Sequence, residues 1–202
     1  MTAATQPATP RSYEVGTIVG GGLKLGIITA LGVTVFALVS RVLEGTPETV
    51  VQSLLVLAGG VIFGFLPAVW LRPSEVDSIA WSSLVGLLGA LTFTIIDTAV
   101  LRPLHLYHFT WDLIGGGSGF WYIPVWWMGS AVTAWLGSWS YAIAGDPAKL
   151  TSTVAQTLGL ALVIFLILVV TGIAPFHTAV MALAFALALI VHIPLAATLR
   201  KQ

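Results

Sequence analysis

Residues 154–171 read VAQTLGLALVIFLILVVT, a run of eighteen residues without a charged side chain. A helix in lipid must satisfy every backbone N–H and C=O within its own segment, so a membrane span appears in a sequence as a long apolar run. At 1.5 Å per residue, such a helix extends about 27 Å, close to the roughly 30 Å hydrocarbon core of a bilayer. This stretch therefore predicts a transmembrane helix.

Similar apolar runs occur along the rest of the chain, and they end at turn-forming segments such as Arg-Pro or Gly-Asp-Pro. The sequence therefore predicts an all-α integral membrane protein with a bundle of about six transmembrane helices, or five if the fourth is irregular. We expect residues 1–14, rich in Thr, Ala and Pro, to be a mobile cytoplasmic tail, and 15–202 to form a single transmembrane domain. Apart from 154–171, the expected spans are about 18–43, 50–71, 79–101, 122–144 and 178–199.

Composition supports this class and excludes others. The chain has 202 residues, 57% of them hydrophobic and only 8% charged, whereas soluble domains carry roughly a quarter charged residues. Eight Lys and Arg balance eight Asp and Glu, so no basic excess favours a nucleic acid, and membrane lipids are the expected surroundings. Without cysteine, the chain has no disulfide, thiolate metal site or cysteine nucleophile.

The distribution of Lys and Arg predicts the orientation of the spans. Short cytoplasmic loops carry an excess of these residues. Six spans place five of the Lys and Arg residues on one side, or six if Lys24 reaches back to it, and two on the other. Both termini are therefore expected in the cytoplasm, in a plasma membrane or bacterial-type inner membrane. The richer side holds Arg11, Arg72, Lys149, Arg200 and Lys201, and the other holds Arg41 and Arg102.

Small residues recur at four-residue spacing within several spans. Such spacing lets helix backbones approach closely, so it predicts a tightly packed bundle. The sets are Gly22/Gly26/Ala30, Gly60/Gly64, Ser130/Ala134/Ser138 and Ala182/Ala186.

The longest loop, between the third and fourth spans, predicts a short interfacial helix over residues 103–114. Pro103 suits the first position of a helix and Gly115–Gly117 would end it. In that helix His105, His108 and Asp112 share one narrow arc, while the remaining residues are mostly apolar. We expect the helix to lie along the outer membrane surface.

Further polar residues are expected at the same level of the membrane. Asp97 lies near the outer end of the third span and His177 beside the outer turn after the fifth, so both are candidates to join His105, His108 and Asp112. Trp111 and Trp121 would cover this cluster. Within the third span, Thr94 shares a helix face with Asp97, whereas Arg102 is expected to point elsewhere.

Three interpretations of this cluster remain open. In the first, the His and Asp side chains face water while their aromatic neighbours anchor in the headgroups. In the second, the cluster binds an organic ligand or substrate. In the third, it binds a metal through His105, His108 and Asp112, whose side chains are good ligands for divalent transition metals. The sequence identifies no cofactor. Deeper in the bundle, His192 is expected to be a hydrogen-bonded core residue.

The sequence therefore favours a non-catalytic role, as a subunit of a larger membrane complex or as a small-molecule-binding component of a transporter. Other membrane subunits or further copies of the chain are the expected partners. The alternative is a membrane-embedded enzyme that acts on a lipid or isoprenoid with the Asp and His cluster as acid–base groups.

Overall fold

The computed structural model describes residues 15–73, 76–106, 122–145 and 147–199. These residues form long helices and no strand, which confirms the all-helical prediction for them. The predicted tail 1–14 lies outside the described residues. The elements are α1 (Val15–Val42), α2 (Gly45–Leu71), α3 (Val76–Ile96), the π-helical turn η1 (Asp97–Leu101), α5 (Tyr122–Ala144), the 3-10 turn η2 (Pro147–Lys149), α6 (Leu150–Val170) and α7 (Thr178–Leu199).

Four of these helices are long and apolar enough to cross a membrane: α1, α2, α3 together with η1, and α6. The α7 helix is apolar over the shorter stretch Thr178–Pro194. The α5 helix matches the predicted fourth span in its bounds but is not among the four. Its tryptophan, tyrosine and serine residues lower its mean hydropathy.

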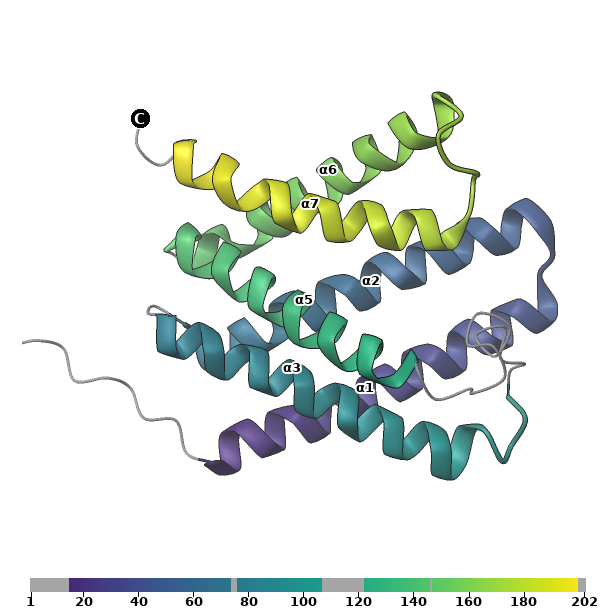
Figure 1. Cartoon of the computed structure of the whole chain (residues 1–202), viewed down its shortest axis with the longest axis horizontal. Helices are drawn as coiled ribbons and strands as arrows, with labels where there is room; N and C mark the ends of the chain where they lie inside the picture. Colours follow the sequence, from purple (N-terminus) through teal and green to yellow (C-terminus); the bar gives the residue numbers. More distant parts are fainter. Residues whose placement is uncertain (1–14, 74–75, 107–121, 146, 200–202) are drawn as a thin grey trace, which may run out of the picture.

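The helices lie side by side with their axes roughly aligned (Figure 1). The α3 helix packs between α1 and α5, and α2 contacts α1, α3, α5 and α7. The α6 helix lies at the edge and packs mainly against α7. The colours of Figure 1 show that α2, α5 and α7 run in one direction and α1, α3 and α6 in the other.

Glycines set the closest approaches between helices, as the small-residue spacing predicts. A Cβ atom at Gly22 would lie 2.4 Å from the Leu88 Cβ, where α1 crosses α3. A Cβ atom at Gly137 on α5 would lie 2.2 Å from the carbonyl oxygen of Gly64 on α2. No side chain fits at either contact, so glycine permits both crossings. Ala182 is exposed on α7, so the last predicted set faces outward.

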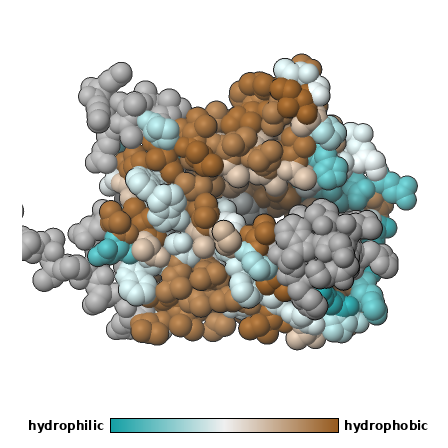
Figure 2. Space-filling model, in the orientation of Figure 1, coloured by the Kyte–Doolittle hydropathy of each residue, from teal (hydrophilic) through white to brown (hydrophobic). Residues whose placement is uncertain are grey.

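The outer surface of the bundle is apolar over much of its length. Large side chains such as Leu31 on α1 and Leu166 on α6 are exposed. Hydrophobic residues cover most of the face seen in Figure 2, and hydrophilic ones gather at the right, where α1 and α2 join. A soluble monomer rarely exposes apolar surface on this scale. The apolar surface of this bundle suits the hydrocarbon core of a membrane.

Candidate functional site at the end of α3

The last turn of α3 is wider than an α-helical turn. Across η1 the backbone N–H of Arg102 donates to the Asp97 carbonyl at 2.9 Å, five residues back. Two features weaken the ordinary ladder here: the Thr98 hydroxyl donates to the Thr94 carbonyl, and Pro103 has no N–H to donate. Single π-turns of this kind occur frequently at functional sites.

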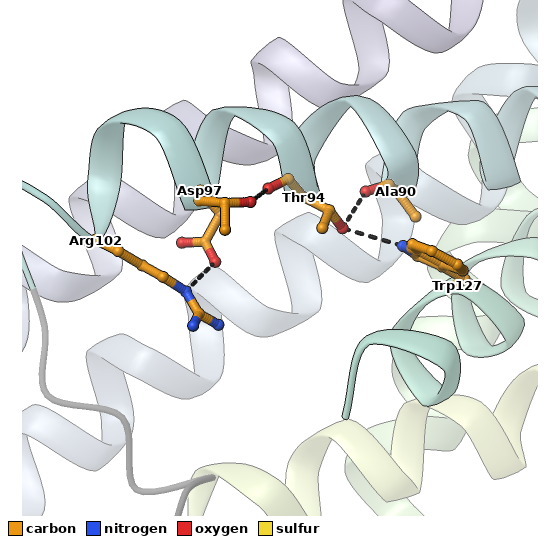
Figure 3. A network of polar contacts seen from close by, with 6 residues as sticks. Ala90, Thr94, Asp97, Arg102 and Trp127 are labelled. Carbon is orange, nitrogen blue, oxygen red and sulfur yellow. Dashed lines mark hydrogen bonds and ion pairs between the residues drawn. The ribbon is translucent and has the colours of Figure 1, made fainter. Parts of the chain in front are cut away.

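The widened turn brings Arg102 onto Asp97. The Arg102 Nε lies 3.1 Å from the Asp97 Oδ2 (Figure 3). The expectation that Arg102 points elsewhere is therefore wrong, because it assumed α-helical geometry, in which residues five apart lie on different faces. The π-turn places positions i and i+5 together.

The two members of the pair differ in exposure. The Asp97 side chain is 4% exposed and the Arg102 side chain 24%. An ionised carboxylate inside a span is costly and normally faces a partner or a cavity. Asp97 is thus buried with a cation beside it, while the Arg102 side chain is partly exposed.

A neutral hydrogen-bond chain lies one turn further into α3. The Trp127 Nε1 of α5 donates to the Thr94 hydroxyl at 3.1 Å, and that hydroxyl donates to the Ala90 carbonyl at 2.8 Å. Figure 3 shows the indole of Trp127 reaching across to α3. The α5 helix is therefore tied to α3 within one turn of the Asp97–Arg102 pair.

Gln52 joins three helices at the same end of the bundle. Its amide nitrogen donates to the Ser40 hydroxyl of α1 and to the Glu48 carboxylate, each at 2.8 Å. Its carbonyl oxygen accepts from the Thr178 hydroxyl of α7 at 3.1 Å. Gln52 was not among the predicted site residues, although a glutamine within an apolar span was a usable signal.

His105 occupies a turn and not the first turn of a helix. Its backbone is left-handed, with φ of 49°, and its carbonyl accepts from the Arg41 guanidinium at 2.5 Å. The predicted surface helix is thus wrong where the structure describes it, over 103–106. The rest of that helix lies outside the described residues, as do His108, Trp111, Asp112 and Trp121.

His177 is exposed and serves the start of α7. Its Nδ1 accepts a hydrogen bond from the backbone N–H of Ala179 at 3.1 Å. This bond satisfies one of the free N–H groups at a helix start. Within the described ranges no three His, Asp or Glu side chains are placed to hold a metal ion, and a site that includes His108 and Asp112 remains a prediction.

Comparisons with protein-family models, with curated proteins and with solved structures each gave no match. The function is therefore inferred from the residues and their geometry.

Proposed function

We propose that this chain is a six-span integral membrane protein that works as a non-catalytic subunit of a membrane complex. The Asp97–Arg102 pair marks the end at which it binds its partner. Four of the six spans are the long apolar helices α1, α2, α3 with η1, and α6. The other two are α5 and α7.

Length and packing support α5 and α7 as spans. With 23 and 22 residues, they extend about 33–35 Å, enough for the hydrocarbon core. The α5 helix has a low hydropathy partly because of serines, and Ser130, Ser138 and Ser140 are all buried in the bundle. These hydroxyls face protein, so they add no cost of contact with lipid.

The positions of the basic residues support an orientation with the α1–α2 junction outside the cell. Arg41 and Arg102 lie at the same end of the bundle, because Arg41 donates to the carbonyl of His105. Arg72 and Lys149 lie at the opposite helix ends. The sequence adds Arg11, Arg200 and Lys201 beyond the first and last helices, which makes that side the richer one.

The observation that carries the non-catalytic role is the ion pair itself. Asp97, the candidate acid–base group, is engaged by Arg102 within its own turn. The nearby Thr94 and Thr98 hydroxyls donate to main-chain carbonyls. These bonds hold the end of α3 in one shape, and Arg102, whose side chain is 24% exposed, forms part of the surface at that end.

Native mass spectrometry of the chain extracted in lipid nanodiscs tests this proposal. We expect the wild type to emerge with a partner, or with further copies of itself, in a fixed ratio. The double variant Asp97→Asn/Arg102→Gln keeps a polar side chain at each position but removes both charges, and it should lose that ratio. Arg72→Gln, at the opposite end, is the matched control and should keep it.

Two results would contradict the proposal. One is a wild type that is monomeric in nanodiscs taken directly from its native membrane. The other is turnover of a lipid or isoprenoid substrate by the purified monomer, abolished by Asp97→Asn, which would favour the enzyme alternative.

A further inference from the structure

A second buried polar group lies near the opposite end of the bundle, between α6 and α7. The Nε2 of His192 lies 3.2 Å from the side-chain oxygen of Gln156. Because a carbonyl oxygen can only accept, this contact is a hydrogen bond in the tautomer that carries its proton on Nε2. A neutral imidazole has one donor and one acceptor nitrogen, which leaves Nδ1 as a bare acceptor.

This acceptor is enclosed in the protein. His192 is 3% exposed, and its Nδ1 has no hydrogen-bond partner among the described residues. A polar atom that is buried without a partner is expensive, and native proteins nearly always provide one. The need is specific, because only a group with an O–H or N–H can satisfy Nδ1.

A matching polar atom lies on α5. The Ser140 hydroxyl is also buried without a partner among the described residues. Leu136 of α5 and Ala188 of α7 belong to one packed cluster, and the two helices run in the same direction (Figure 1). Ser140 lies four residues after Leu136, and His192 lies four residues after Ala188, which is about one helical turn in each case. Contacts along α2 give the same register, because Gly137 of α5 meets Gly64 and Phe185 of α7 meets Gly60. The two unpartnered groups therefore lie at a similar level along the bundle.

We propose that His192 and Ser140 form a binding site for a small hydroxyl group. The bound oxygen donates its hydrogen to the His192 Nδ1 and accepts the hydrogen of the Ser140 hydroxyl. A hydroxyl oxygen makes both bonds at once, whereas a carbonyl has no hydrogen to donate. This site is independent of the proposed partner-binding end.

Two sources carry this chemistry: a water molecule, and the hydroxyl of a membrane alcohol such as diacylglycerol. His192 lies seven residues before Leu199, the last residue of α7, and Gln156 lies six after Leu150, the first of α6. These separations correspond to about 9–11 Å of helix. Gln156 is exposed on α6, so the pair also approaches the lipid-facing surface.

Nitrogen-15 NMR of the full chain, labelled at histidine, tests the site. The chain has four histidines, so single His→Gln variants at 105, 108 and 177 assign the fourth signal to His192 by elimination. Three samples are compared. Two are nanodiscs of phosphatidylcholine, which has no O–H group, one in H₂O and one in D₂O. The third is nanodiscs of phosphatidylcholine with diacylglycerol. We expect Nδ1 to show the shift of a hydrogen-bonded acceptor.

Comparison of these nanodisc samples identifies the source of the hydroxyl. Magnetisation transfer to Nδ1 in pure phosphatidylcholine, lost in D₂O, indicates bound water, and transfer that requires diacylglycerol indicates a lipid hydroxyl. The acceptor shift should persist in Ser140→Ala and in Ser138→Ala, its matched control on α5. A proton on Nδ1, an acceptor shift absent under all conditions, or a shift lost only in Ser140→Ala would overturn the proposal. In the last case Ser140 itself would be the donor.

Discussion

The two buried polar residues, Asp97 and His192, are accommodated in different ways. Asp97 has the guanidinium of Arg102 at 3.1 Å, brought onto it by a change in helix type. His192 shares one hydrogen bond with Gln156, while its other nitrogen has no protein partner within the described part of the chain. An unpaired buried charge costs far more than an unpaired neutral atom. The helix geometry is therefore distorted where the charge lies.

The largest effect should follow from removing the counter-charge. Arg102→Leu removes the cation beside the buried Asp97 carboxylate, and breaking a buried pair in this way costs about 3–5 kcal/mol. Asp97→Asn should cost less, because Arg102, which then loses its counter-charge, is the more exposed partner. Denaturant titration of the free energy of unfolding in mixed micelles measures both.

The double variant Asp97→Asn/Arg102→Leu is the control for that comparison. It removes both charges, so its loss of stability should be smaller than that of Arg102→Leu alone. Equal losses in the single and double variants would show that the ion pair is not what stabilises the end of α3.

The next effect concerns the close packing of α5 against α2. Gly137→Ala places a methyl group against the Gly64 carbonyl, and overpacking of this kind costs about 1–3 kcal/mol. Gly129→Ala is the matched control, since nothing lies within 4 Å of its added Cβ. Unchanged melting temperatures for both variants would contradict the close α2–α5 contact.

A moderate effect is expected at Gln52. Gln52→Leu removes three hydrogen bonds that tie α2 to α1, to its own first turn and to α7. Hydrogen bonds within membrane proteins average about 0.6 kcal/mol, so the total should be about 1–2 kcal/mol. Hydrogen–deuterium exchange should then rise at the first turn of α7. Exchange that rises evenly along the chain would argue against this local role.

The smallest effect should come from the neutral chain beside Asp97. Trp127→Phe removes the donor to Thr94 and keeps most of the ring, so we expect a loss of about 0.6 kcal/mol. The same titration that tests Arg102→Leu resolves the difference. A loss as large as that of Arg102→Leu would remove the distinction between charged and neutral contacts.

The helices could be predicted from the sequence because each one is a long apolar run with a stop signal at its end. Arg72-Pro73 closes α2, and Gly145 ends α5 with a positive φ. The α3–α5 pairing was not predictable in register, but its small residues were visible in the Ser130/Ala134 spacing. Local composition thus predicts the helices and part of their packing.

The candidate site was predicted only in part. Asp97 could be singled out as an ionisable residue in a span, but its pairing with Arg102 depends on one widened turn, which apolar periodicity does not encode. Gln52 was visible as a polar residue within an apolar span, but its contact with Thr178, 126 positions away in the chain, was not predictable. Contacts of this range depend on the tertiary fold and leave no local pattern.

The central claim is a six-span protein with the α1–α2 junction outside, and labelling of single cysteines in intact cells tests it most directly. The chain has no cysteine of its own, so each reporter is unambiguous. Reporters at Thr46, Leu104 and Ile173, all exposed, should react with an impermeant maleimide from outside. Reporters at Val76 and Ala148 should react only after the membrane is permeabilised. Labelling of Leu104 and Ala148 from the same side would show that α5 does not cross, and would contradict the account.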